Sequence, residues 1–261
     1  MTVDIKNKAL DLTDIGVRFG GISALDGVSL QLYEGEICGL IGANGAGKTT
    51  LFDVISGVRL ADRGKVQLNG QDATAWSSHR RARSGLRRTF QRVQLFGWLS
   101  VEENLLVATE WRGGNGGVLA DLVAPIARRR LENERRQRAG EVLERCGLSS
   151  IRNERAAGLP IGTARLVELA RALVDQPSVL LLDEPASGLD HGEADRFGDI
   201  VRSLRDDEGT SVLLVEHDVG FVMDNVDRIV VLHLGRVLAT GTPEEIRNNP
   251  AVAEAYLGVS A

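Results

Sequence analysis

Apolar and polar positions alternate along the first part of the chain in a way that predicts β-strands. Residues 9–19 and 22–32 alternate loosely and are separated by glycines, which indicates two strands joined by a turn. Residues 36–42 form an apolar run typical of a buried strand, followed by a glycine-rich loop and a short helix that ends at Gly57. Residues 63–74 predict a hairpin with Asn69 and Gly70 at its turn.

The middle of the chain, from about residue 91 to residue 155, has helical character. Ser100 and Glu103 have the spacing of a capping box, which predicts the start of a helix. A glycine-rich break at 113–117 precedes a highly charged helix over 126–148. Its arginines form either a basic patch or a solvated face; we favour the solvated face, with i,i+4 pairs to Glu132, Glu134 and Glu141.

Strands and helices alternate again after Gly158. We expect a helix over 169–176 that stops before Pro177, a buried strand at 178–183, an amphipathic helix at 194–207 and another buried strand at 211–218. A hairpin follows at 228–241, and Thr242 with Glu245 opens a last helix that has proline at its first position. The pattern predicts an α/β core interrupted by a helical insertion over roughly 92–158.

Composition narrows the class of protein. The chain has 261 residues, 43% of them hydrophobic, and a net charge of −5, which fits an ordinary globular protein and argues against nucleic acid as its main partner. No apolar run approaches the ~18 residues that span a bilayer, and no signal peptide is visible. Two cysteines, Cys38 and Cys146, make no disulfide framework and read as small packed side chains, so we expect a cytosolic protein.

The glycine-rich loop carries the most specific chemistry. Residues 42–49 fit G-x-x-x-x-G-K-[ST], in which glycines let backbone N–H groups curl around phosphate oxygens at the start of a helix. Lys48 would reach the β- and γ-phosphates, and the Thr49 hydroxyl would hold Mg²⁺. The alternative is a purely structural turn. The candidate nucleotide-binding residues of the loop are Gly42, Ala43, Asn44, Gly45, Ala46, Gly47, Lys48, Thr49 and Thr50.

Two carboxylates at the end of a buried strand complete the pattern. Asp183 would belong to the Mg²⁺ shell, and Glu184 would polarise the attacking water as a general base. Alone, an apolar run that ends in Asp-Glu is as well explained as a solvated strand end. The N-K-x-D pattern typical of GTPases is missing, because the only Asn-Lys pair, at 7–8, lies far from any base site. ATP with Mg²⁺ is therefore the expected ligand.

These motifs, in this order, resemble the nucleotide-binding subunit of an ATP-binding-cassette (ABC) transporter over essentially the whole chain. The resemblance implies one ABC ATPase domain over 1–261, with a P-loop NTPase (RecA-like) α/β core. It implies a mostly parallel sheet, an N-terminal antiparallel β subdomain and the helical subdomain inserted at 92–158. The lead-in at 88–96, the stretch LSVEENLLVA at 99–108 and the ending at 241–258 are similar to the subunits of branched-chain amino acid importers.

The resemblance also implies roles for residues that mean little alone. Phe19 matches the aromatic that stacks on adenine, Gln91 the glutamine that meets metal and water, and His217 the switch histidine at the γ-phosphate. Ser187 and Asp190 belong to a loop that communicates across a dimer. The alternatives are an ordinary strand aromatic for Phe19 and a structural histidine for His217.

The family signature, typically L-S-G-G-Q, departs from its usual form. Here it reads Leu159-Pro160-Ile161-Gly162-Thr163. Of the central S-G-G, only the second glycine is kept, as Gly162. Pro160 has no N–H to donate, and Thr163 replaces glutamine. One hypothesis is that a partner subunit supplies a stronger signature and the two ATP sites are unequal.

The function implied is ATP hydrolysis that powers a membrane transporter at the cytoplasmic face of the membrane. The implied partners are a second ATP-binding subunit, identical or related, two transmembrane permeases and an external substrate-binding protein. Leu95, Phe96 and Trp98 either meet the permeases or pack inside the insertion. Import of branched-chain amino acids or small amides is favoured. A lipid or lipopolysaccharide exporter and a non-hydrolysing regulatory subunit remain as alternatives.

Overall fold

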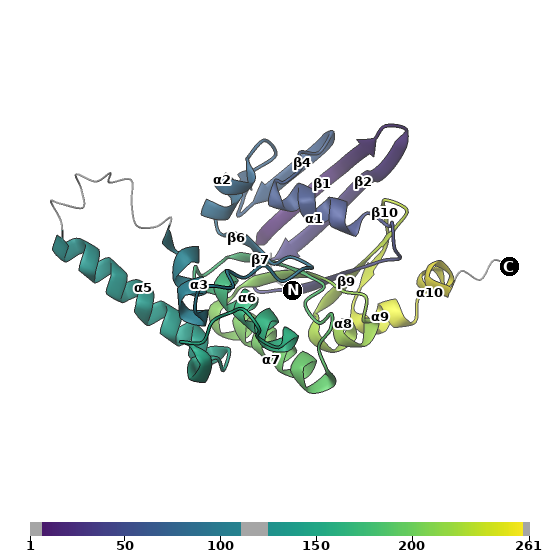
Figure 1. The fold of residues 1–261 in the computed structure, drawn as a ribbon. Helices are drawn as coiled ribbons and strands as arrows, with labels where there is room; N and C mark the ends of the chain where they lie inside the picture. The colour runs from purple at the N-terminus through teal and green to yellow at the C-terminus, as the bar shows by residue number, and fades with distance from the viewer. Residues whose placement is uncertain (1–6, 111–124, 258–261) are drawn as a thin grey trace, which may run out of the picture. The chain divides into compact units, whose positions relative to one another are not determined.

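The computed structural model describes residues 7–110 and 125–257 (Figure 1). It divides into two compact units. The first unit comprises Met1–Gln91, Pro177–Ser187 and Ala194–Ala261, and the second comprises Arg92–Gln176 and Gly188–Glu193. The glycine-rich break predicted at 113–117 and the last residues of the chain lie outside the described residues.

The first unit contains an antiparallel sheet near the N-terminus. Its order is β2-β1-β4-β5, built from β1 (Lys8–Phe19), β2 (Ile22–Tyr33), β4 (Arg63–Leu68) and β5 (Gln71–Asp72). Asn69 and Gly70 join β4 to β5 with φ values of 49° and 74°. Positive φ at both central residues is what a tight hairpin turn of this kind requires. The predicted antiparallel subdomain and its hairpin are therefore confirmed.

The second sheet of this unit is mostly parallel, as predicted. Its order is β10-β9-β3-β8-β7-β6, and β9–β10 is its antiparallel pair. Every residue of β3, β7 and β8 is buried, as expected for parallel strands covered on both faces. The bounds are β3 (Ile37–Ile41), β6 (Leu86–Arg88), β7 (Val179–Asp183), β8 (Ser211–Val215), β9 (Arg228–His233) and β10 (Arg236–Gly241).

Helix α1 (Lys48–Ser56) supplies a central part of the core. Its Leu51, Phe52 and Ile55 are fully buried in a cluster that includes side chains from both sheets. The helix ends at Gly57, which has φ 74° and the left-handed conformation of a C-cap, as predicted. The core thus fixes the loop at 42–47 directly at the helix start.

Shorter helices complete the first unit. α9 begins with the predicted capping box at Thr242, and β6, α2, α8 and α10 were not predicted. The bounds are α2 (Ser78–Arg83), α8 (Val219–Asn225), α9 (Pro243–Arg247) and α10 (Pro250–Leu257), and α7 (His191–Glu208) starts in the second unit and continues in the first.

The second unit is helical and has its own core. It contains α3 (Val101–Ala108), α5 (Pro125–Arg145), the 3₁₀ turn η2 (Ser149–Ile151) and α6 (Ile161–Leu173). Ser100 accepts from the Glu103 N–H, and the Glu103 carboxylate accepts from the Ser100 N–H, so the predicted capping box is present. Val101, Leu105 and Leu143 are buried between these helices.

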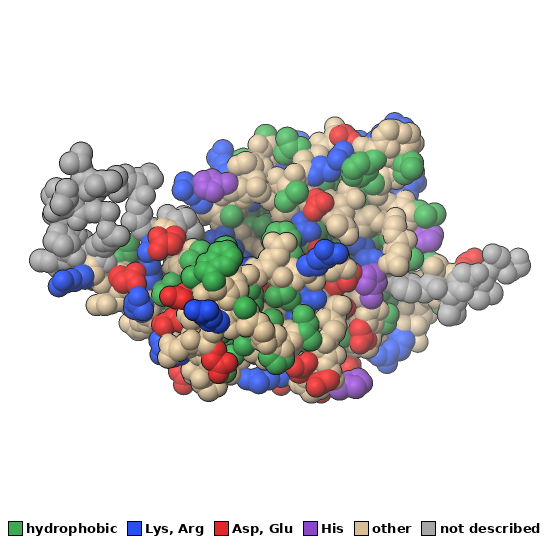
Figure 2. Space-filling view, viewed as in Figure 1, with side chains coloured by type: hydrophobic (Ala, Val, Ile, Leu, Met, Phe, Trp, Pro, Cys, Tyr) green, Lys and Arg blue, Asp and Glu red, His purple; other side chains and the backbone are tan. Residues whose placement is uncertain are grey.

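The described part of α5 has the predicted solvated face. Arg130 pairs with Glu134 at 3.1 Å and Arg136 with Glu132 at 2.9 Å, both one turn apart. Glu141 also accepts from Gln137 Nε2, one turn away, at 2.9 Å. Figure 2 shows acidic and basic side chains interspersed along this helix. Within residues 7–110 and 125–257, no helix combines the length and apolar character needed to cross a bilayer.

Candidate functional site

The loop between β3 and α1 has a backbone that only glycine allows at two positions. A Cβ on Gly42 would lie 2.3 Å from the Leu232 carbonyl oxygen, so no side chain fits there. Gly47, the N-cap of α1, has φ 106°, and a Cβ on it would lie 2.6 Å from the Ala24 carbonyl oxygen. The start of α1 is therefore held close to its neighbours with its N–H groups facing the loop.

Lys48 folds back onto the loop. Its side chain is buried, and Nζ donates to the Gly42 carbonyl at 2.6 Å and to the Ala43 carbonyl at 3.1 Å. Burial lowers the pKa of Lys48, and the negative charges of Glu184 and Asp183 oppose that shift. A phosphate would offer the ammonium a charged partner in place of neutral carbonyls.

A cavity of about 540 Å³ opens beside this loop. Predicted residues from four separate stretches of the chain meet in its wall: the loop at 44–50, Gln91, Glu184 and His217. Its lining is Ala24, Asn44, Gly45, Ala46, Gly47, Lys48, Thr49, Thr50, Gln91, Glu184, Val215 and His217. The lining does not include five other predicted residues of the first unit, which are Phe19, Gly42, Ala43, Asp183 and Ser187.

Glu184 lines the cavity and contacts two other residues of its wall. Gln91 Nε2 donates to Glu184 Oε2 at 2.8 Å, and His217 Nε2 lies 2.7 Å from Glu184 Oε1. The residue has φ 50°, and its N–H donates to the Val215 carbonyl at 2.9 Å. Non-glycine residues with positive φ are uncommon and gather at functional sites. The three residues predicted to be catalytic are thus in direct contact.

A second glutamate, Glu216, was missed by the sequence analysis. It is buried, and its carboxylate accepts from the backbone N–H groups of Ala186 at 2.6 Å and His217 at 2.9 Å. Burial raises the pKa of Glu216, and these backbone hydrogen bonds oppose the shift. The carboxylate ties the segment after β7 to the segment after β8, which positions His217. Its only sequence signal is an acid next to the predicted histidine.

Asp183 is buried at the end of β7 and has hydrogen-bond partners within the protein. Arg88 of β6 donates to Asp183 Oδ2 at 3.0 Å. The Asp183 N–H donates to the Thr89 hydroxyl at 3.3 Å. Arg88 was not predicted to belong to the site, since β6 itself was not predicted.

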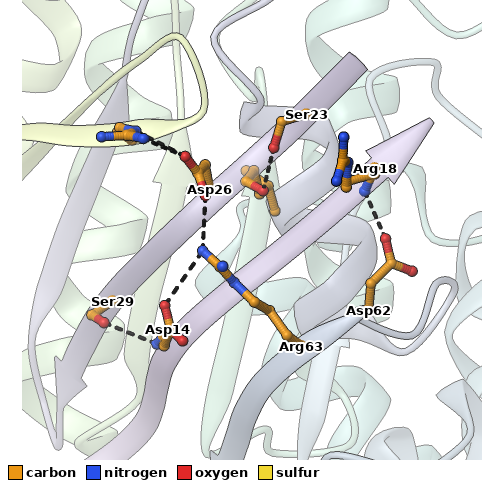
Figure 3. A network of polar contacts seen from close by, with 9 residues as sticks. Asp14, Arg18, Ser23, Asp26, Ser29, Asp62 and Arg63 are labelled. Atoms are coloured by element: carbon orange, nitrogen blue, oxygen red, sulfur yellow. Dashed lines mark hydrogen bonds and ion pairs between the residues drawn. The ribbon is translucent and has the colours of Figure 1, made fainter. Parts of the chain in front are cut away.

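Phe19 lies at the end of β1 and is half exposed. The Arg59 guanidinium carbon lies 4.1 Å from the centroid of its ring, and Arg59 also donates to the Arg18 carbonyl at 3.2 Å. Figure 3 shows the polar network of the same sheet, in which Asp26 accepts from Arg63 at 2.8 Å and from Arg236 of β10 at 2.5 Å. Phe19 thus lies at the end of an inner strand, with the Arg59 guanidinium over its ring.

The signature segment belongs to the second unit. Pro160 is the N-cap of α6, and its carbonyl accepts from the Ala164 N–H at 2.9 Å. A Cβ on Gly162 would lie 2.0 Å from Glu193 Oε1. Glu193 and Asp190 in turn hydrogen-bond reciprocally, side chain to backbone. A side chain at 162 would therefore displace the Glu193 carboxylate.

Aromatic side chains of the second unit are exposed after the Gln91 segment. Trp98 is 74% exposed and Phe96 39% exposed, with their ring centroids 6.0 Å apart. Figure 2 shows hydrophobic side chains gathered over the α3 region. Leu95 is half-buried. The exposure of Trp98 excludes the alternative in which it packs inside the insertion.

Comparisons with known proteins bear on the family of this chain. A family model described as "ABC transporter" matches residues 25–187, and one described as "Branched-chain amino acid ATP-binding cassette transporter" matches residues 236–261. The chain is 43% identical over 249 residues to the high-affinity branched-chain amino acid transport ATP-binding protein LivG of Escherichia coli K12, covering 95% of this chain and 97% of that protein.

Two further matches bear on the fold and the alternatives. The lipopolysaccharide export system ATP-binding protein LptB of Haemophilus influenzae is 36% identical over 88% of this chain and 89% of its own. The structure of the ADP conformation of MJ1267, an ATP-binding cassette of an ABC transporter, superposes with a TM-score of 0.83 at 31% identity and covers 97% of this chain and 99% of that one. The chain therefore belongs to the ABC transporter family, as one of its ATP-binding, ATP-hydrolysing cassettes.

Proposed function

We propose that this chain is the ATPase subunit of an importer of branched-chain amino acids or closely related small amides. The observation that carries the ATPase assignment is the contact of Glu184 with both Gln91 and His217 in the cavity beside Lys48. The substrate class rests on the identity to LivG and on the match of the C-terminal residues 236–261. LivG, at 43% identity, is also more similar to this chain than the lipopolysaccharide export protein is, at 36%.

The nucleotide would lie along the loop and the edge of the first sheet. Residues 42–50 would surround the phosphates, with Lys48 as their charged partner, and Phe19 would stack on adenine. In the opposite site of a head-to-tail pair, Gly162, Ser187 and Asp190 would face the nucleotide of the partner. Because Pro160 replaces a donor there, unequal sites in a mixed pair remain part of this proposal.

The donor chemistry of three residues fits Mg²⁺. Thr49 offers a hydroxyl, Gln91 an amide and Asp183 a carboxylate, and Mg²⁺ prefers such oxygen ligands together with the phosphates of a substrate. Among the described residues no cluster of three or more His, Cys, Asp or Glu side chains forms a cage for a metal. That composition suits an ion that is bound mainly through the nucleotide. When bound, the ion would neutralise the charge of the transferred phosphoryl group.

The reaction implied is attack of water on the γ-phosphate. Glu184 would accept the proton of that water, the bond from the β–γ bridging oxygen to the γ-phosphorus would break, and ADP would leave with the electron pair. Gln91 and His217 hold the two oxygens of Glu184 and so fix where its lone pairs point. The buried Glu216 fixes the backbone of His217.

The partners implied are a second cassette, two permeases and an external substrate-binding protein. ATP would act as a ligand that binds the closed pair far better than the open pair, and only that difference can shift the equilibrium. The insertion at 92–158, with Phe96 and Trp98 exposed, would meet the permeases at the cytoplasmic face of the membrane.

Reconstitution with its own permeases and binding protein in vesicles tests this function. We expect ATP-dependent accumulation of radiolabelled leucine, isoleucine or valine. Extraction of lipid or lipopolysaccharide with no amino acid uptake would favour the export alternative. ATP binding without turnover in the complete complex would favour a regulatory subunit.

A further inference from the structure

We propose that Arg88 is a positioning residue for the metal side of the site: it is a resident counter-ion of Asp183 that competes with the bound cation for that carboxylate. This inference rests on the proposed function, because it takes Asp183 as a member of the metal shell. Nothing in the motif that contains Asp183 requires an arginine at this place.

The geometry is that of a buried clamp with two arms. One terminal nitrogen of Arg88 donates to Asp53 Oδ1 at 2.7 Å and to the Ser56 hydroxyl at 3.1 Å. The other terminal nitrogen donates to Asp183 Oδ2 at 3.0 Å. Asp53 and Ser56 belong to α1, and Asp183 ends β7. One guanidinium therefore joins the phosphate-loop helix to the carboxylate of the metal side.

The surroundings make the charge of Arg88 effective. Its side chain is only 8% exposed, and its guanidinium carbon lies 5.6 Å and 5.3 Å from the ring centroids of Phe52 and Phe90. Little water screens a pair in such a place, so removing one partner leaves a poorly compensated charge. The positive charge of Arg88 is thus shared by two carboxylates, those of Asp53 and Asp183.

This sharing of the Arg88 charge determines how strongly Asp183 attracts a second cation, the metal ion. Arg88 engages Oδ2, and its positive charge weakens the attraction of Asp183 for a metal ion. Without Arg88, Asp183 would gain attraction for the metal. Without Asp53, the arginine would compensate Asp183 alone, and the metal would bind less well. Substitutions of Arg88 and of Asp53 are thus expected to change the metal affinity in opposite directions.

The position of Arg88 in the chain adds a second role. Arg88 ends β6, and Gln91, three residues later, donates to Glu184. The segment 88–91 thus contacts both consecutive carboxylates, Asp183 through Arg88 and Glu184 through Gln91. A change in this segment would reach the metal side and the base together.

The test measures binding of Mn²⁺, as a stand-in for Mg²⁺, to the full chain saturated with ADP, through the electron paramagnetic resonance signal of free Mn²⁺. Compared with the unsubstituted protein, we expect Arg88→Met to lower the dissociation constant of Mn²⁺ by about threefold or more. We expect Asp53→Asn to raise it by a similar factor of about three. Equal constants in all three proteins, or changes of the opposite sign, would overturn the proposal.

Arg81 supplies a matched control. It is even more buried, at 1% exposure, but its guanidinium donates to backbone carbonyls, those of Val54 and Ile55 in α1 and of Ala73. Arg81→Met should lower the thermal midpoint, as Arg88→Met does, yet leave the Mn²⁺ constant unchanged. A purely structural role for Arg88 would make the two variants behave alike.

The outcomes also separate this proposal from the proposed function. Failure of the unsubstituted protein to bind ADP and Mn²⁺ would contradict the function itself. Normal binding there, with no difference between Arg88→Met and Arg81→Met, would contradict only the role of Arg88. If Arg88→Met does not fold, Asp53→Asn decides, because that variant keeps the Arg88–Asp183 pair and predicts weaker binding.

Discussion

His217 Nε2 lies 2.7 Å from Glu184 Oε1, on the opposite side of the carboxylate from Gln91. A base that is engaged on both oxygens has its orientation fixed before any water arrives. Its side chain is largely buried, at 14% exposure, which strengthens each of these contacts. An attacking water must therefore compete for, or share, an oxygen that the protein already holds.

Glu184→Gln should bind ATP but hydrolyse it at least about a hundredfold more slowly, the scale of general-base catalysis. The amide keeps the size of the side chain and loses the basic oxygen. Steady-state phosphate release in the complete complex measures the effect, and size-exclusion chromatography with ATP should show the closed pair accumulating. A turnover rate equal to that of the unsubstituted protein would remove Glu184 from this role.

Lys48→Ala should weaken ATP binding by about 1.5–3 kcal/mol, because a buried charge-assisted contact to phosphate is lost. Isothermal titration of ATP measures the change. Lys8→Ala is the matched control, since Lys8 is a half-exposed lysine that pairs with Asp11 at 2.8 Å, away from the cavity. Unchanged affinity at position 48 would contradict the assignment of the loop.

Arg59→Ala should raise the dissociation constant of ATP by about two- to fivefold, the scale of an exposed cation–π contact. The guanidinium lies 4.1 Å from the centroid of the Phe19 ring, which we propose to stack on adenine. Arg80, whose guanidinium carbon also lies 4.1 Å from an aromatic centroid, that of Trp76, is the matched control. Arg80→Ala should leave the constant unchanged, as measured with a fluorescent adenine nucleotide. Equal effects of both variants would mean that Phe19 has no special part in binding.

Gly162→Ala should destabilise the second unit, because the added Cβ would overlap the Glu193 carboxylate. Because the carboxylate is the end of a flexible side chain that can shift, the cost expected is about 1 kcal/mol, the low end for overpacking. Glu193→Ala removes the overlapping atoms, so the double variant should recover part of the loss in thermal midpoint. Strict additivity of the two single effects would show that the carboxylate is not what excludes a side chain at 162.

Burial raises the pKa of the Cys38 thiol from 9.0 to about 12. The native state therefore keeps its proton where the unfolded chain loses it, and this contribution to stability is complete below about pH 9 and is lost as pH rises toward 12. At pH 8 we expect no alkylation of native Cys38 by iodoacetamide and rapid alkylation in denaturant. Mass spectrometry of digested samples measures both, and fast native labelling would contradict the burial.

The elements that sequence patterning predicts well are those with strong local signals. The buried strands β3, β7 and β8 are continuous apolar runs, and Ser100 and Thr242 carry capping boxes. β6 has only three residues and includes two arginines, so no apolar period marks it. The short helices α2 and α8 likewise give no window long enough to show a period.

The candidate site divides in the same way. The loop at 42–49 is a contiguous motif, so its chemistry is readable without a structure. The roles of Phe19, Gln91, His217, Gly162, Ser187 and Asp190 come from resemblance and stay predictions. Arg88 and Glu216 act through partners 95 and 30 residues away along the chain, and only folding brings such pairs together.

Asp26 bridges the strand edge of one sheet to the edge of the other, through Arg63 on β4 and Arg236 on β10 (Figure 3). These charges are open to solvent, and dissolved ions screen such attractions within about 10 Å at 0.1 M salt. The Asp26–Arg236 pair therefore adds a salt-sensitive link between β2 and β10, beside the apolar packing of Leu25 and Val237. Concentrated salt should weaken this link and leave the apolar interior around α1 intact.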